Sequence, residues 1–334
     1  LFAVDVASGK RTRLDNRGTV AGVTAGRDAI VYGRDDLKST AQLYRLSPRG
    51  GEPVALTRFN AARMAGLALG DYEQFTFAGW NGETVHAYLV KPANFSAGTK
   101  YPLAFLIHGG PQGSFGNHFH YRWNPQTYAG QGYAAVMVDF HGSTGYGQAF
   151  TDSISGDWGG KPMEDLQKGL AAALAKYDFL DGDRVCALGG SYGGYMANWI
   201  AGNWNEPFRC LVSHSGVFDN RMMAYSTEEL WFDEWEFQGK PWLKPDAYER
   251  HNPVNQVGNW SKPILVVHGQ LDFRIPVEQG IAAFTAAQGR EVPSQFLYFP
   301  DENHWILKPA NSILWHDTVN AWLKRWFEAP VESK

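Results

Sequence analysis

The residues best placed to do chemistry lie in a glycine-rich run, Gly189-Gly190-Ser191-Tyr192-Gly193-Gly194. The run follows the apolar segment 185–188, which predicts a strand, and precedes a helical pattern that we expect to begin near Tyr195. A Gly-x-Ser-x-Gly pattern at a strand-to-helix turn is typical of a nucleophile elbow, because the glycines let strand and helix approach and leave the serine hydroxyl exposed. We therefore predict that Ser191 is a nucleophile; a glycine-rich turn with an idle serine is the alternative.

A serine hydroxyl is a weak nucleophile at neutral pH and needs a base that a third group orients. On folds that use such an elbow, the chain order is serine, then a carboxylate, then histidine. Asp272 follows the apolar run 264–267, and His304 lies in the loop after the next apolar run, 295–299. We predict that His304 is the general base and then the general acid, and that Asp272 orients its imidazole.

Other side chains compete for these two roles. His268 lies inside the predicted strand before Asp272 and is expected to be buried. His214 ends another predicted strand, but it precedes Asp272 and would break the chain order. Asp301 and Glu302 could replace Asp272, although carboxylates so near the histidine in sequence are more typical of a solvated loop.

Acyl transfer also needs hydrogen-bond donors for the charge that develops on the carbonyl oxygen, and one such donor typically contributes ~3 kcal/mol. The first expected donor is the backbone N–H of Tyr192, directly after the nucleophile. The second comes from a loop after an early strand. The segment His108-Gly109-Gly110-Pro111 follows the apolar run 103–107, so we predict Gly110 as this donor. An ordinary tight turn is the alternative.

The elements that must position these residues alternate along the chain from Tyr101 onward. The short apolar runs are 103–107, 134–138, 184–188, 210–213, 264–267 and 295–299, and the segments of helical period are 163–177, 194–204, 277–288 and 312–327. This alternation predicts α/β architecture, with a mostly parallel sheet covered on both faces and ligands at the carboxyl ends of its strands. Before it, Asn81-Gly82 between two strand-like segments predicts a β-hairpin.

The first sixty residues show a different pattern, with short strand-like segments that repeat. Leu1-Phe2-Ala3-Val4-Asp5 lines up with Leu43-Tyr44-Arg45-Leu46-Ser47 at an offset of 42 residues, within the range of a four-stranded propeller blade. We therefore predict that residues 1–65 are the last, incomplete part of a β-propeller and that residues 66–334 form the catalytic domain. Two chance hairpins are the alternative to the propeller.

Composition excludes several classes of protein. The 334 residues are 44% hydrophobic and 19% charged, which indicates a folded globular chain rather than a disordered one. A formal net charge of -4 without long runs of one sign argues against a nucleic-acid partner, and no apolar stretch is long enough to span a bilayer. The chain starts at Leu1 without a leader-like segment, so we interpret it as a fragment or a processed chain. Cys186 and Cys210 match no metal or disulfide framework and are interpreted as two buried thiols.

Taken together, the motifs resemble the prolyl oligopeptidase family of serine peptidases. They are His108-Gly109-Gly110-Pro111, Gly142-Ser143-Thr144-Gly145-Tyr146-Gly147, the elbow, and His268-Gly269 with Asp272-Phe273-Arg274-Ile275-Pro276. The segments 108–113 and 302–305 look most like the branch with dipeptidyl peptidase V and acylaminoacyl peptidase. Over about residues 70–328, the resemblance implies an α/β-hydrolase domain that a β-propeller caps, so that only short peptides reach the serine. It also implies a secreted or periplasmic enzyme without metal or cofactor, and it leaves homo-oligomerisation open.

The resemblance also points to substrate-binding residues. In relatives that release dipeptides, acidic groups often hold the free amine of the substrate, and Glu228 and Glu229 are candidates here; a solvated first helical turn is the alternative. Arg274 either meets a substrate carbonyl or pairs with a local acid. The candidates for an aromatic pocket, with core packing as the alternative, are Phe218, Trp231 and Phe232.

These inferences predict a serine exopeptidase that releases dipeptides from the N-terminus of short peptides through an acyl-enzyme, with a small or hydrophobic residue before the cleaved bond. An acylaminoacyl peptidase or a carboxylesterase would use the same triad, because ester and amide acyl transfer need the same groups. A requirement for a free substrate amine would discriminate between them. A hydrolase fold that works only as a binding module predicts a broken triad, and the triad is intact here.

Overall fold

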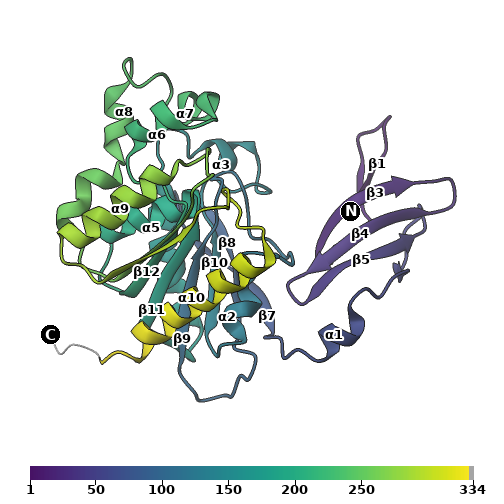
Figure 1. The fold of residues 1–334 in the computed structure, drawn as a ribbon. Coiled ribbons are helices and arrows are strands. Elements are labelled where there is room, and N and C mark those ends of the chain that lie inside the picture. The colour runs from purple at the N-terminus through teal and green to yellow at the C-terminus, as the bar shows by residue number, and fades with distance from the viewer. Residues whose placement is uncertain (331–334) are drawn as a thin grey trace.

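An eight-stranded mixed sheet forms the centre of the larger part of the molecule (Figure 1). In the computed structural model, which describes residues 1–330, its strand order is β14-β13-β12-β11-β9-β10-β8-β7. These strands are β7 (Tyr72–Ala78), β8 (Thr84–Val90), β9 (Tyr101–Ile107), β10 (Ala134–Asp139), β11 (Leu180–Gly190), β12 (Phe208–His214), β13 (Ile264–Gly269) and β14 (Ser294–Phe299). The strands from β14 to β10 run parallel, whereas β8 pairs in antiparallel fashion with both β10 and β7. The predicted mostly parallel sheet is therefore confirmed.

Helices cover both faces of this sheet. The helices of one face are α4 (Lys161–Lys176), α5 (Tyr192–Asn203) and α9 (Val277–Gly289), and those of the other are α2 (Pro125–Ala129) and α10 (Pro309–Glu328). Within β9, Phe105 and Ile107 belong to the core under the first set, whereas Ala104 and Leu106 belong to the core under the second. Because successive side chains of a strand point to opposite faces, a strand buried on both faces is apolar throughout, which is why these runs could be predicted.

The β7–β8 hairpin follows the prediction from Asn81-Gly82. The register pairs Tyr72 with Val90 and Ala78 with Thr84. Asn81 and Gly82 both have positive φ, 54° and 76°, as an Asn-Gly turn requires. The turn differs from the expected two-residue connection because it contains a 3-10 turn over Trp80–Gly82.

Short helices carry the chain over the carboxyl end of the sheet. They are α3 (Gln148–Asp152) after β10, and α6 (Asn220–Ser226), α7 (Leu230–Glu236), α8 (Pro245–Arg250) and the 3-10 segment Pro253–Asn259 between β12 and β13. The last group lies at the top of Figure 1. Of these helices only the start of α7 was considered, as the alternative for Glu228 and Glu229. Segments of five to seven residues are too short to show a helical period.

The N-terminal part forms two separate antiparallel sheets, seen on the right of Figure 1. One contains β1 (Phe2–Val4) and β2 (Arg11–Arg13); the other contains β3 (Thr19–Ala25), β4 (Ile30–Asp36), β5 (Ser39–Leu46) and β6 (Val54–Ala55), after which α1 (Ala61–Ala65) leads to β7. Phe2 pairs with Arg13, and Tyr44 pairs with Ala55, which is the same pairing shifted by 42 residues. This equal strand pairing supports the sequence repeat at an offset of 42 residues. The propeller and the domain boundary at residue 65 stay predictions, and residues 331–334 of the predicted catalytic domain lie outside the described residues.

The N-terminal sheet contacts the loop that joins β9 to α2. The Thr19 hydroxyl donates to the carbonyl oxygen of Asn117 at 2.8 Å, and the Leu37 N–H donates to the Asn117 side chain at 3.0 Å. His118 Nδ1 lies 2.7 Å from Asp35 Oδ1. Strands β3 and β4 and the turn after β4 therefore hold this loop in place.

Cys186 and Cys210 form a disulfide, so the expectation of two buried thiols is wrong. The two residues face each other in the register of the adjacent strands β11 and β12, with 4.8 Å between their Cα atoms. Their separation of 24 residues matches no disulfide pattern, and only the strand pairing brings them together.

In the part of the chain that the structure describes, no helix combines the length and the apolar character that a membrane span requires.

Helix α7 contains a buried carboxyl group without a polar partner. Asp233 is 1% exposed, and neither of its side-chain oxygens has a hydrogen-bond partner among residues 1–330. Burial, with the nearby charges of Glu229 and Glu236, raises the pKa of Asp233 to about 7. The folded chain therefore holds a proton here between about pH 4 and pH 7 that the unfolded chain releases, so this group destabilises the fold as the pH rises through that window.

We predict that Asp233→Asn flattens this part of the stability profile, because the amide cannot ionise. From pH 5 to pH 8, the free energy of unfolding of the variant should gain at least about 1 kcal/mol relative to the unchanged protein. Urea unfolding at both pH values measures the effect, with Asp246→Asn on the exposed start of α8 as the control. Parallel profiles for the Asp233 variant and the unchanged protein would contradict the assignment.

Candidate active site

Ser191 occupies a strained turn between β11 and α5. Its backbone has φ 60° and ψ -120°, a sparsely populated conformation that costs of order 1–3 kcal/mol. The Ser191 N–H donates to the carbonyl oxygen of His214 at 2.9 Å, and its carbonyl accepts the first helical bond from Tyr195. Helix α5 begins at Tyr192, three residues earlier than expected, so the serine lies directly at the helix N-terminus.

The turn depends on glycine because α5 passes against β9. A Cβ atom at Gly193 would lie 2.2 Å from the carbonyl oxygen of Ile107, a distance that no side chain can adopt. Strand β9 leads directly into the predicted oxyanion loop, so this contact also brings that loop to the serine.

Asp272 and His304 meet as the sequence predicts. Asp272 Oδ2 lies 2.7 Å from His304 Nδ1, while Asp272 Oδ1 accepts the backbone N–H of Arg274 at 3.1 Å and of Ile275 at 2.9 Å. Burial alone would raise the pKa of Asp272, but contacts with His268 and His304 lower it below its usual value. The ionised carboxylate accepts the Nδ1 proton of His304, which leaves Nε2 as the basic nitrogen.

One cavity of about 340 Å³ brings the serine and the histidine together. Its wall includes Ser191 and His304, together with Arg122, Trp123, Glu229 and Arg274. The cavity lies at the carboxyl ends of β9, β11 and β12, where an α/β sheet is expected to bind its ligand. A nucleophile and a base thus line one cavity, and the carboxylate that orients the base lies behind the histidine.

The loop after β9 runs directly against the serine turn. A Cβ atom at Gly109 would lie 3.1 Å from Ser191 Cβ. Gly110 has φ 128°, which an L side chain rarely adopts. Within residues 1–330, the backbone N–H groups of Gly110 and Tyr192 donate to no protein acceptor, so both remain available to an oxyanion.

His108 holds the peptide group that carries the Gly110 N–H. Its Nδ1 lies 2.8 Å from the carbonyl oxygen of Gly109, and its Nε2 lies 2.8 Å from the Ser143 hydroxyl. A carbonyl only accepts, so Nδ1 carries the proton; burial lowers the pKa of His108, which favours this neutral form. Because a trans peptide points its C=O and N–H in opposite directions, fixing the Gly109 carbonyl also orients the Gly110 N–H.

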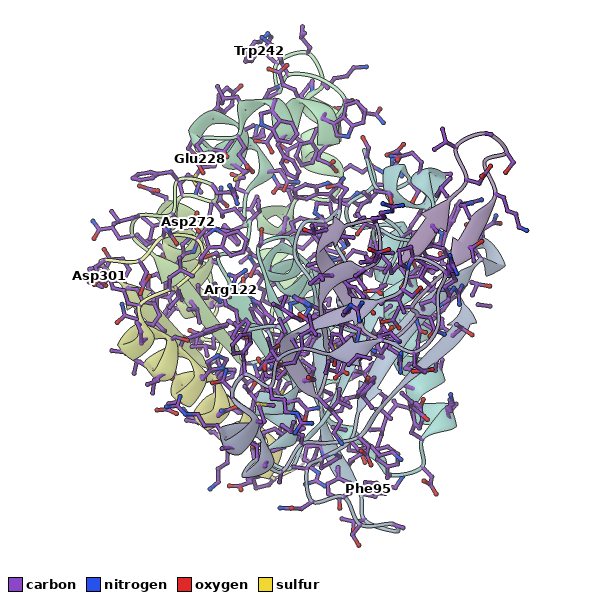
Figure 2. All side chains as sticks on the ribbon, turned by 90° about the vertical axis from the view of Figure 1, so that its right-hand side faces the viewer. Phe95, Arg122, Glu228, Trp242, Asp272 and Asp301 are labelled. Carbon is purple, nitrogen blue, oxygen red and sulfur yellow. A yellow bond between two sulfur atoms is a disulfide. The ribbon has the colours of Figure 1, made fainter. Side chains whose placement is uncertain are left out.

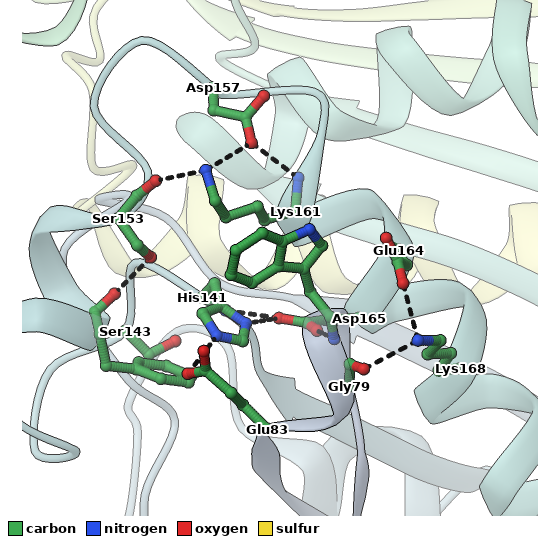
Figure 3. A network of polar contacts seen from close by, with 12 residues as sticks. Gly79, Glu83, His141, Ser143, Ser153, Asp157, Lys161, Glu164, Asp165 and Lys168 are labelled. Atoms are coloured by element: carbon green, nitrogen blue, oxygen red, sulfur yellow. Dashed lines mark hydrogen bonds and ion pairs between the residues drawn. The ribbon is translucent and has the colours of Figure 1, made fainter.

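A polar network behind the cavity fixes the segment that carries Ser143 (Figure 3). His141, just after β10, places Nδ1 2.6 Å from Asp165 Oδ2 and Nε2 3.2 Å from Glu83 Oε2. Burial alone would lower the pKa of His141, but these two carboxylates raise it. The end of β10 is therefore anchored to α4 and to the β7–β8 turn before the chain reaches Ser143.

One buried carboxylate connects the two predicted oxyanion donors. Glu236 accepts a hydrogen bond from Gln112 Nε2 at 2.7 Å and another from Trp158 Nε1 at 2.6 Å. Gln112 follows Gly110 by two residues, and the carbonyl oxygen of Trp158 accepts the Tyr192 hydroxyl at 2.5 Å. Helix α7 thus links the loop after β9 to the start of α5, a connection that no sequence motif indicated.

The predicted polar substrate residues form an ion-pair cluster. Glu229 and Arg274 both line the cavity, and Arg274 Nε lies 3.1 Å from Glu229 Oε1. Glu228 lies 3.8 Å from Arg274 and outside the cavity wall. Of the two alternatives for Arg274, pairing with a local acid is the one seen here.

The three predicted aromatic residues do not line the cavity. Phe218 is buried in the core against Trp260, Trp231 is 68% exposed, and Phe232 packs near Trp158. The aromatic side chains that do line the wall are Phe115, Trp123 and Trp305. They come from loops without a distinctive pattern, so the sequence could not identify them.

The rival histidines have other roles. His268 is fully buried, and its Nε2 lies 2.8 Å from the carbonyl oxygen of Ile275. His214 lines the cavity beside Trp123 and Trp315, and burial holds its pKa well below the usual value. His214 is therefore a neutral wall residue rather than the partner of Asp272.

The rival carboxylates do not contact His304. Asp301 pairs with Lys308 on the surface, and Glu302 accepts the backbone N–H groups of Leu307 and Lys308. Both acids therefore shape the loop after β14.

Among residues 1–330, no group of three or more His, Cys, Asp or Glu side chains has the geometry to hold a metal ion.

Comparison with known proteins agrees with this architecture. Residues 119–330 match the prolyl oligopeptidase family. The chain is 47% identical over 259 residues to the dipeptidyl-peptidase 5 of Schizosaccharomyces pombe, covering 77% of this chain and 38% of that protein. It is 36% identical over 333 residues to the dipeptidyl-peptidase 5 of Porphyromonas gingivalis, covering 98% and 48%.

A solved structure extends the likeness to the whole described fold. The acylaminoacyl peptidase of Pyrococcus horikoshii superposes with a TM-score of 0.88 at 23% identity, covering 98% of this chain and 52% of that one. The present chain therefore spans less than half the length of the two curated relatives and about half of this structure.

Proposed function

Because this chain belongs to the prolyl oligopeptidase family, we propose that its cavity is the active site of a serine peptidase that releases dipeptides from the N-terminus of short peptides. The observation that carries this proposal is the presence, around one cavity, of a strained serine and of a histidine hydrogen-bonded to a buried carboxylate. The dipeptide product is supported by the two relatives named dipeptidyl-peptidase 5. The family predicted from the motifs is confirmed by the match over residues 119–330.

In the proposed reaction, Ser191 Oγ attacks the carbonyl carbon before the cleaved bond while His304 Nε2 takes its proton. Asp272 stabilises the imidazolium that results, and the N–H groups of Gly110 and Tyr192 stabilise the negative oxygen. His304 then gives its proton to the leaving amine, and the acyl-enzyme remains on Ser191. A water molecule repeats the two steps and releases the dipeptide as a carboxylic acid.

An acylaminoacyl peptidase is the second candidate, and it is the one that needs no rearrangement of the charges in the cavity. Glu229 is the only carboxylate in the described cavity wall, and Arg274 neutralises it. A free substrate amine needs an acidic partner, whereas an acylated one does not. A dipeptidyl peptidase would have to displace Arg274 from Glu229 or use acids from the rest of the full-length protein.

We predict that Ser191→Ala abolishes hydrolysis in the full-length protein and leaves the fold intact. The loss of kcat should reach at least about 1000-fold, because a triad without its nucleophile retains only binding and oxyanion stabilisation. Release of a chromogenic amine from free-amine dipeptide amides measures kcat, and circular dichroism checks the fold. Ser96→Ala, on an exposed loop outside the cavity wall, is the control. Retained activity in the Ser191 variant would exclude this serine as nucleophile.

The same assay decides between the two candidate functions. Free-amine dipeptide amides with Ala or Phe before the leaving group are compared with their N-acetylated forms and with a short-chain ester. A preference for the free amines establishes the dipeptidyl peptidase. Faster turnover of acetylated amides or of the ester instead keeps the triad and assigns the enzyme as an acylaminoacyl peptidase or an esterase.

The Gln112–Glu236 contact gives a further prediction. Gln112→Ala should lower kcat about tenfold with little change in KM, because a mobile loop weakens an interaction made chiefly in the transition state. Gln148→Ala is the matched control, since Gln148 also donates to a carboxylate but on the exposed helix α3. Equal effects of the two substitutions, or a change confined to KM, would show that Gln112 does not position the oxyanion loop.

A further inference from the structure

The charges in the wall of the cavity do not balance. The charged side chains there, histidines aside, are Arg122, Glu229 and Arg274. Glu229 and Arg274 pair with each other. Arg122 forms no ion pair and no hydrogen bond with any of residues 1–330, although it is half-buried. The cavity therefore presents one uncompensated positive charge.

Arg122 stacks on a tryptophan ring in this position. Its guanidinium lies over the Trp305 ring, 3.8 Å from the ring centroid, an arrangement that leaves the N–H groups at its edge free to bind a ligand. The loop that carries it is fixed to the N-terminal sheet through Asn117 and His118. Figure 2 shows Arg122 between this part of the chain and the elements that carry Asp272.

Burial of an unpaired cation is unfavourable, and an anion restores the balance. Burial lowers the pKa of Arg122 to about 10, and no acid in the described part of the chain offsets this effect. A carboxylate matches the planar fork of a guanidinium with two parallel hydrogen bonds. A ligand with a carboxylate would thus supply the partner that the described residues lack.

The location of Arg122 identifies which part of the substrate it would meet. Trp305, on which it stacks, directly follows His304. In the proposed reaction, His304 hands its proton to the leaving amine, so the leaving portion lies on the His304 side of the cavity. Trp123, next to Arg122, packs against Gly190 and brings this loop to the serine turn. Arg274 lies farther from the same ring, 6.0 Å from its centroid, and pairs with Glu229. Arg122 is therefore the arginine beside His304 that is available to the leaving portion.

We propose that Arg122 forms a subsite for a carboxylate on the leaving portion of the substrate. This inference rests on the proposed peptidase function. In a tripeptide, the leaving amino acid carries its free α-carboxylate one carbon atom away from the nitrogen that His304 protonates. The subsite would therefore favour tripeptides with a free C-terminus, and an acidic side chain at the same position is the other source of the same group.

The experiment uses the full-length protein and matched tripeptides with a free N-terminus, ending either in a carboxylate or in an amide. For the unchanged protein, kcat/KM should be at least about tenfold higher for the carboxylate, as expected for a charge-assisted contact. Arg122→Gln should bring the ratio of the two substrates to within about twofold of one, and Arg122→Lys to an intermediate value. Arg325→Gln is the control, because Arg325 also lies over a tryptophan ring but on α10.

A second substrate pair separates the two sources of the carboxylate. Amidated tripeptides that end in glutamate or glutamine differ only in the charge of the side chain. A preference for glutamate that disappears in Arg122→Gln would assign the subsite to acidic side chains as well. Equal rates for this pair, with a preference for the free C-terminus, would assign it to the α-carboxylate alone.

The possible failures are distinguishable. Equal kcat/KM for carboxylate and amide in the unchanged protein would overturn the subsite, and this result needs no variant to fold. An equal loss on both substrates in Arg122→Gln would also overturn it, because Arg122 would then act through Trp305 and not on the ligand. Cleavage of no tripeptide at all would instead overturn the proposed peptidase function.

Discussion

The backbone contact between β9 and α5 is the constraint on which the site depends. Only a glycine at position 193 lets the helix lie against the carbonyl oxygen of Ile107, and this contact brings two pieces of the site together. It places Ser191 at the helix start, in a conformation that the chain would not adopt alone. It also sets the loop with Gly110 beside the serine. The sheet, with helices on both faces, supplies the packing that sustains this strain.

Buried carboxylates around the cavity behave differently because their partners differ. Burial alone would raise the pKa of Asp272, but its contacts with His268 and His304 lower it. Asp233 is equally buried but has no hydrogen-bond partner within residues 1–330, and its pKa rises to about 7. Glu236 lies between these cases: burial raises its pKa, while Trp158 and Gln112 lower it. Burial sets the cost of the charge, and hydrogen bonds decide whether a carboxylate stays ionised.

Features with a local cause could be predicted from the sequence. The parallel strands could be predicted because both of their faces are buried, which makes them apolar throughout. The elbow could be predicted because only glycine fits where its backbone passes close to other backbone atoms. The assignment of Ser191, Asp272 and His304 stays a prediction that the geometry supports. Contacts between distant segments were not predictable: Cys186 meets Cys210 only through strand register, and Arg122 meets Trp305 only through two long loops. Phe218 was a candidate only because it is an aromatic residue beyond the elbow, and the fold places it in the core.

The charges of the cavity suggest how one site could recognise both ends of a short peptide. The Glu229–Arg274 pair is partly exposed, with side chains 27% and 34% accessible, and such pairs contribute only about 0–1 kcal/mol to stability. A substrate amine could therefore displace Arg274 from Glu229 at little cost. The displaced Arg274 would then be free to meet a carbonyl oxygen of the acyl portion, so neither of the two interpretations of this residue excludes the other. Arg122 has no polar partner among residues 1–330, so a carboxylate on the leaving portion would bind it without displacing any of those residues.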